Sequence, residues 1–81
     1  MRYVVFRMYA FRRILAVSRT HSFDPSEAYK VWAMQNGMTP QFTQDGYVTT
    51  RLNICDEAKF RRCITELILN GTLEEEDFET E

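Results

Sequence analysis

Aromatic and β-branched residues dominate the first part of the chain, in runs that are typical of extended strands. Tyr3–Phe11 predicts one strand and Ile14–Thr20 predicts a second. The simplest connection between them is a tight hairpin turn near Ala10–Arg13. Because that turn contains no Gly or Asn, a single long bulged strand is the alternative. Either way, the pattern predicts that the chain opens with β structure.

The next segment carries the start and stop signals of a helix. Asp24 is a suitable N-cap, and Pro25 suits the first helical position because its missing N–H is not needed there. Gly37 supplies the left-handed residue that ends a helix running to about Asn36. Trp32 lies on the apolar side of this helix, and we expect it to anchor the core.

A hairpin is predicted after this helix, with its turn at Asp45-Gly46. A two-residue loop would pair Phe42 with Thr49, whereas a three-residue loop with a Gly bulge would pair Phe42 with Val48. We prefer the bulged loop because it places the apolar residues of both strands on one face of the sheet.

The last helix has the clearest pattern in the chain. Asp56 is its expected N-cap, and Gly71 is its expected end. Between them, apolar residues recur at the spacing of one helical face. These residues are Phe60, Cys63, Ile64, Leu67 and Ile68.

Together these elements predict one small α+β domain over residues 1–71. Their order is ββ-α-ββ-α, and the expected architecture is an antiparallel sheet with two helices packed on one face. Residues 72–81 hold six acids and no base, so they are predicted to be a disordered acidic tail.

Charge is distributed unevenly along the chain, although the formal net charge is only −2. All ten Lys and Arg residues lie in residues 1–71, with six of the twelve acids, so that part carries a net charge of +4. The arginines of residues 1–23 scatter around a helical wheel and interrupt every apolar run, which argues against a targeting segment. No apolar run is long enough to cross a membrane, and the two cysteines suit a reduced, cytoplasmic protein.

Candidate catalytic chemistry is sparse. His21 is the single histidine and has no convincing nucleophile or orienting carboxylate near it in sequence. Cys55 and Cys63 are too far apart along a helix to form a disulfide, and with one histidine they make a weak zinc-ligand set. We therefore expect no metal, no cofactor and no enzymatic activity.

The basic aromatic segment at the start of the chain is the main candidate binding surface. Aromatic side chains beside arginines on a sheet can stack on bases and contact phosphates. The candidate residues, for a protein partner or a nucleic acid, are Tyr3, Arg7, Tyr9, Arg12, Arg13 and Arg19.

The acidic tail offers three alternatives. It can fold back on the arginines, imitate a phosphate backbone, or dock a partner protein through its aromatic residue. The candidate tail contacts are Glu74, Glu75, Glu76, Asp77 and Phe78.

Two RNA-binding folds were compared with this pattern. The RNA recognition motif runs β-α-β-β-α-β and carries a Gly- and aromatic-rich third strand. Tyr47–Leu52 lacks that signature, and no strand is predicted after the last helix. The double-stranded-RNA-binding fold begins with a helix, which is not predicted here. The sequence therefore assigns the chain to neither family.

The hypothesis that best fits these observations is a small non-enzymatic interaction protein that binds and modulates, and most simply inhibits, another protein. Chains of this kind are common among phage and mobile-element accessory proteins that act on a host enzyme, toxin or nuclease. The alternative is an RNA- or single-strand-binding module that uses the basic aromatic sheet face. A homodimer formed through an unpaired first strand is a third reading.

Overall fold

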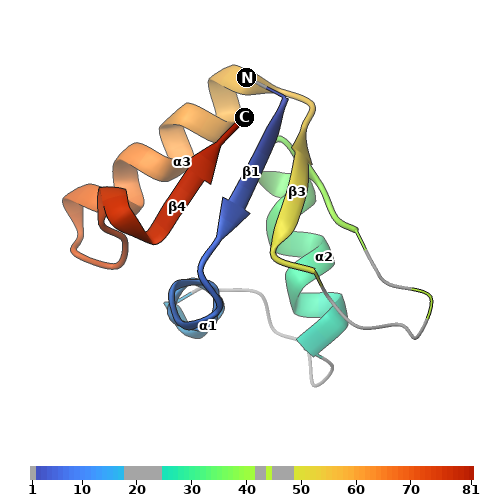
Figure 1. The fold of residues 1–81 in the computed structure, drawn as a ribbon, viewed down its shortest axis with the longest axis horizontal. Helices are drawn as coiled ribbons and strands as arrows, with labels where there is room; N and C mark the ends of the chain where they lie inside the picture. Colours follow the sequence, from blue (N-terminus) through green and yellow to red (C-terminus); the bar gives the residue numbers. More distant parts are fainter. Residues whose placement is uncertain (1, 18–24, 42–43, 45–48) are drawn as a thin grey trace.

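The computed structural model describes residues 2–17, 25–41, 44 and 49–81. Along the chain these residues form seven helices and strands and one short 3₁₀ turn (Figure 1). The elements are β1 (Tyr3–Phe6), α1 (Met8–Val17), α2 (Pro25–Gln35), β2 (Met38–Thr39), β3 (Arg51–Ile54), α3 (Glu57–Leu69), the turn η1 (Glu75–Asp77) and β4 (Phe78–Thr80).

The four strands form one antiparallel sheet in the order β2-β3-β1-β4. Val4 at the centre of β1 lies opposite Leu52 on one side and Thr80 on the other. This is the strand order of a split β-α-β domain, here with two helices in the first crossover. The predicted α+β class and antiparallel sheet are confirmed. The homodimer hypothesis required an unpaired first strand. That requirement is not met, because β1 is paired with β3 on one edge and with β4 on the other.

The predicted second strand is wrong, because Met8–Val17 forms helix α1. The predicted turn at Ala10–Arg13 lies in the middle of this helix. Ala10, Phe11 and Ile14 bury one side of α1 against the core, at a spacing that fits a helix, whereas a strand would place Phe11 on the face opposite to Ala10 and Ile14. Most of the other residues of α1 are good helix formers, so helix propensity and burial both favour a helix here.

The two later helices are confirmed. Gly37 has φ +75° and ends α2, and Gly71 has φ +81° just after α3. The Asp56 side chain caps α3 by accepting a hydrogen bond from the Lys59 N–H (3.2 Å). Trp32 is buried, as expected of a core anchor. The proposed cap at Asp24 lies outside the described residues.

The hairpin between β2 and β3 is described only at its base. Met38 lies opposite Ile54, and Thr39 lies opposite Asn53. Phe42, Val48 and the Asp45-Gly46 turn lie outside the described residues, so the predicted loop type stays a prediction.

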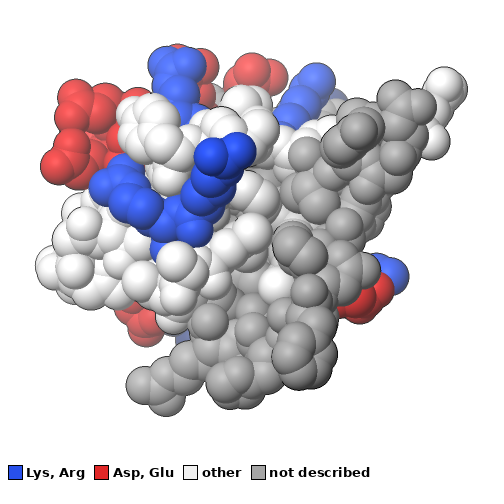
Figure 2. Space-filling view, turned by 90° about the horizontal axis from the view of Figure 1, so that it is seen from below, with Lys and Arg blue, Asp and Glu red and all other residues white. Residues whose placement is uncertain are grey.

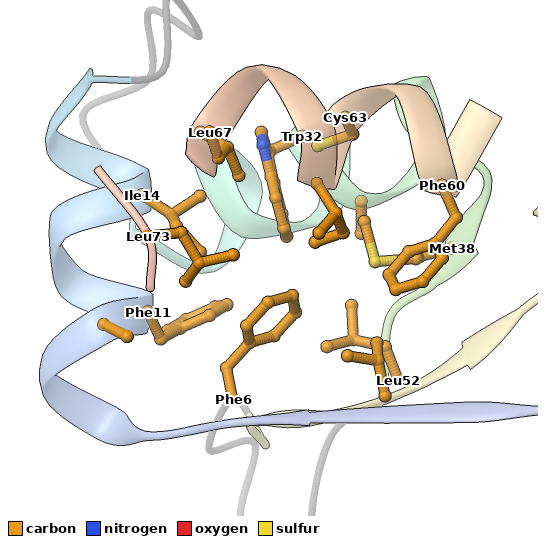
Figure 3. Close-up of a cluster of buried hydrophobic side chains, with 14 of the residues drawn as sticks. Phe6, Phe11, Ile14, Trp32, Met38, Leu52, Phe60, Cys63, Leu67 and Leu73 are labelled. Carbon is orange, nitrogen blue, oxygen red and sulfur yellow. The ribbon is translucent and has the colours of Figure 1, made fainter. Parts of the chain in front are cut away.

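A layer of aromatic residues forms the centre of the core (Figure 3). Phe6 points from β1 into the space beneath the helices, with its ring centroid 6.4 Å from Phe11, 5.9 Å from Trp32 and 6.2 Å from Phe78. On α3, the predicted stripe is buried from Phe60 to Leu67, whereas Ile68 is exposed. Helices α2 and α3 cover one face of the sheet, and α1 packs beyond the end of β1 (Figures 1 and 3).

The prediction of a disordered tail is wrong. Leu73 is buried, and Phe78–Thr80 forms the edge strand β4 beside β1. The absence of a strand after the last helix was therefore also a wrong expectation. Acidic composition indicated disorder, but Leu73 and Phe78 supply enough apolar surface to hold the segment on the core.

Candidate functional site

The predicted binding residues do not share one sheet face. Tyr3 lies on the face of the sheet that the helices leave open, and Tyr9 lies on α1. Arg12 and Arg13 also lie on α1, so the structure separates them from Tyr3. Arg7 lies between β1 and α1. Arg19 lies outside the described residues. The basic aromatic strand surface expected from the sequence is therefore wrong as a single platform.

Asp77 holds two of these residues in place. Its carboxylate accepts hydrogen bonds from the Tyr9 hydroxyl (2.9 Å), the Arg13 guanidinium (2.8 Å) and the Glu74 N–H (3.0 Å). Its carbonyl oxygen accepts from the Arg7 N–H (2.8 Å). Asp77 is only 2% exposed, so this carboxylate is satisfied by the protein rather than by water.

These contacts lower the pKa of Asp77 below its usual value of 3.8. The main cause is the Glu74 backbone N–H, and Tyr9 and Arg13 add to it against the opposing effect of burial. The same carboxylate raises the pKa of Tyr9. Tyr9, Arg13 and Asp77 therefore act together as a structural clasp between α1 and the C-terminal segment.

The end of the acidic segment folds back on the arginines through three of its acids. Besides the pair of Arg13 with Asp77, Glu79 lies 3.7 Å from Arg7, and Glu81 lies 3.9 Å from Arg51. Figure 2, seen from the side where α1 lies nearest, shows a group of basic side chains beside a group of acidic ones. Of the three roles considered for this segment, folding back on the arginines is the one that the geometry supports.

The open face of the sheet carries one aromatic side chain among the described strand residues. That residue is Tyr3, and the Arg51 guanidinium stacks 4.3 Å from its ring centroid. Glu79 and Glu81 point to the same face, because they lie opposite Val5 and beside Tyr3 in the register. The face is therefore charge-balanced, which weakens it as a site for a polyanion.

The other tail candidates divide into two groups. Glu74, Glu75 and Glu76 are exposed, and none of them forms an ion pair with a base among the described residues. A hydrogen bond and charge repulsion from Glu74 raise the pKa of Glu76. Phe78 packs against Phe6, so it is part of the core rather than a free docking residue.

Among the described strands, β4 lies at one edge of the sheet with no neighbour on its outer side. Tyr3 and Glu81 exchange two backbone hydrogen bonds (3.1 and 2.9 Å), and the Arg7 N–H donates to the Asp77 carbonyl. In an antiparallel ladder these bonds alternate along the strand. The N–H and C=O groups of Phe78 and Thr80 therefore point away from β1, to the side where the described part of the sheet has no further strand.

A groove of about 330 Å³ runs beside this edge, lined by residues of β4 and α3. These two elements lie side by side in the fold (Figure 1). Its lining residues are Phe60, Arg61, Ile64, Thr65, Phe78 and Thr80. Phe60 and Ile64 are buried and form an apolar floor, whereas Arg61 is held by Glu57 at 2.9 Å on the rim. An exposed strand edge beside an apolar groove can accept an extended peptide as an added strand.

Sequence reasoning missed this arrangement. The signal that could have found it is the alternation of Phe78, Glu79, Thr80 and Glu81, which is the pattern of a half-buried strand. The run of acids before it obscured that alternation.

The structure does not bring the remaining candidate catalytic and metal-binding residues together in one site. Cys63 is buried, and desolvation together with Glu66 raises its pKa to about 11, so it is a poor nucleophile. Cys55 is exposed, and His21 lies outside the described residues. Within the described ranges, no group of three or more His, Cys, Asp or Glu side chains is placed to hold a metal ion. None of the described helices is long and apolar enough to span a membrane.

Comparison of the chain with protein-family models, with curated proteins and with solved structures finds no match. The geometry of the chain is therefore the only basis on which a function can be inferred.

Proposed function

We propose that this protein is a non-enzymatic binding module that modulates a partner protein by accepting an extended segment of it as an added strand beside β4. The observation that carries this proposal is the free edge of Phe78–Thr80 next to the groove over Phe60 and Ile64. Main-chain hydrogen bonds at such an edge supply affinity, and side-chain contacts in the groove supply specificity. A partner segment held in this way is unavailable for its other contacts, which is a simple route to inhibition.

The rest of the C-terminal segment supports the proposal by fixing the edge in place. The Asp77 clasp anchors the start of β4 to α1, and the Glu81 backbone bonds to Tyr3 hold its end. A rigid edge binds an incoming strand without a further ordering cost in the protein itself.

The test uses one variant that removes a single outward donor. Thr80→Pro deletes the N–H that faces away from β1 and leaves the bonds to β1 in place, because proline is tolerated on edge strands. Thr80→Ala is the matched control that keeps the N–H. Peptides are selected from a random phage-displayed library on the wild-type protein, and their affinities are measured for all three proteins.

We expect the selected peptides to bind wild type and Thr80→Ala alike and to bind Thr80→Pro at least about tenfold more weakly. Peptides methylated on alternate backbone nitrogens provide the same test on the unaltered protein, in case Thr80→Pro does not fold. Equal binding to all variants, or no selected peptide, overturns the proposal.

Nucleic-acid binding is the competing outcome, and it has one observation in its favour. Tyr3 and Arg51 lie together on the open face of the two central strands, where a base could stack. Salt-sensitive binding of a single-stranded oligonucleotide that Tyr3→Ala abolishes and Thr80→Pro leaves intact would replace the protein-binding proposal.

A further inference from the structure

The side chains along the β4 edge determine which kind of strand would fit beside it. A strand added to a sheet projects its side chains alternately to the two faces. Beside β4, one set of positions faces the groove, next to Phe78 and Thr80, and the other set faces the open side, next to Glu79 and Glu81.

The charges at this edge are arranged with acids outermost. Glu79 lies on β4 and Glu81 directly follows it, whereas the arginines that approach them lie on the inner side of β4: Arg7 follows β1, and Arg51 lies on β3. These ion pairs are long, at 3.7 and 3.9 Å, and their side chains are half exposed or more, so the acids remain available to a neighbouring cation. The exposed Glu74, Glu75 and Glu76 precede the same strand and extend the negative region.

The groove side of the edge is mainly apolar, in contrast to the acidic open side. Phe60 and Ile64 form its floor, and Phe78 and Thr80 form its β4 wall. An apolar side chain of a partner would be removed from water there, which is favourable in proportion to the area buried.

We infer that the segment bound at β4 alternates basic and apolar residues, with lysine or arginine side chains beside Glu79 and Glu81 and aliphatic side chains over Ile64. This inference rests on the proposed function and specifies its partner. A second copy of β4 is a poor occupant. Twofold pairing about Glu79 would bring the two Glu79 carboxylates against each other, and like charges directly opposite are destabilising.

The experiment uses three synthetic peptides of equal length with blocked ends. They alternate Lys with Val, Glu with Val, and Thr with Val. Each is titrated into the ¹⁵N-labelled protein, and the shifts of the backbone amides of β4 and α3 are followed. We expect the Lys-Val peptide to shift the Phe78 and Thr80 amides and to bind more tightly than the Thr-Val peptide, with the Glu-Val peptide the weakest.

Protein variants then locate the charge effect. The double variant Glu79→Gln/Glu81→Gln is expected to bind the Lys-Val peptide roughly fivefold to tenfold more weakly and to lose its salt dependence. The variant Glu27→Gln/Glu66→Gln changes the net charge by the same amount on α2 and α3, and it should bind like wild type.

The outcomes separate the two proposals. If all three peptides bind at β4 with equal affinity and Thr80→Pro weakens all three, strand addition holds and the basic-apolar assignment is wrong. If both double variants weaken binding equally, general charge attraction replaces the β4 assignment. If no peptide shifts the β4 amides, the proposed function also fails.

Discussion

The two glycines with positive φ provide a test of how tightly the helices are joined. Gly37 and Gly71 follow α2 and α3 with nearly the same backbone conformation, φ +75° and +81°. They differ in their surroundings. A Cβ on Gly37 would collide with the Asp56 carbonyl oxygen and lie 3.0 Å from the Cβ atoms of Asp56 and Lys59, whereas a Cβ on Gly71 would meet nothing within 4 Å.

The cost of alanine at each site follows from this difference. A left-handed alanine costs about 1–2 kcal/mol, partly offset by about 0.4–1 kcal/mol from its smaller unfolded-state entropy. Gly71→Ala should therefore lose about 1 kcal/mol. At Gly37 the collision with Asp56 also pushes the two segments apart, which weakens the hydrogen bonds that the Gly37 carbonyl accepts from the Cys55 and Asp56 N–H groups. Two weakened hydrogen bonds add about 2 kcal/mol, which gives a total loss of about 3 kcal/mol for Gly37→Ala.

The measurement is thermal unfolding of wild type and both variants, followed by circular dichroism. For a domain of this size the melting temperature should fall by roughly 4–8 °C in Gly71→Ala and by at least twice as much in Gly37→Ala. Both variants place an alanine in a left-handed backbone conformation and so share the same backbone strain. An equal loss of stability in the two variants would therefore show that Gly37 does not closely approach the start of α3.

Three other perturbations test separate parts of the structure. The lowered pKa of Asp77 means that its carboxylate stabilises the fold above pH 3.8 and that this contribution is lost as the pH falls through the folded-state pKa. Asp77→Asn should therefore have a lower free energy of unfolding than wild type near neutral pH. Its free energy of unfolding should also fall less steeply as the pH is lowered into the acid range, and an unchanged acid dependence would show that Asp77 does not hold α1 to the C-terminal segment. Deletion of residues 78–81 removes β4 and uncovers Phe6, so thermal unfolding should lose its cooperativity, and an unchanged melting curve would restore the disordered-tail model. Cys55 should react with a thiol reagent in the native protein and Cys63 only after denaturation, and fast reaction of both would show that Cys63 is not buried.

The elements with local start and stop signals were predictable from the sequence. Asp56 and Gly71 bound α3 because a cap and a left-handed residue act within one turn of the helix and need no knowledge of the rest of the fold. The same is true of Gly37 at the end of α2.

The elements that depend on distant contacts were not predictable in this way. The aromatic and β-branched residues around Phe11 and Ile14 favoured a strand, although a spacing of three residues places this pair on one face only in a helix. Contacts of Phe11 with Tyr29 and Trp32 of α2 bury that face and stabilise the helix. Asp77 looked like one acid in a charged run, but its partners Tyr9 and Arg13 are more than sixty residues away. The candidate site was missed for the same reason, because an edge strand is defined by the strand it lacks as a neighbour.

The central position of β1 has a consequence for the synthesis of the chain. Tyr3–Phe6 leaves the ribosome well before its two neighbours in the sheet, residues 51–54 and 78–80. None of the hydrogen bonds of β1 within the sheet can form until most of the chain has been translated, and those to β4 form last. Such non-local pairing slows folding relative to a protein with local contacts. The nascent chain therefore presents an apolar, unpaired strand until residues 51–54 have been translated, and β4 adds to the other side of β1 later.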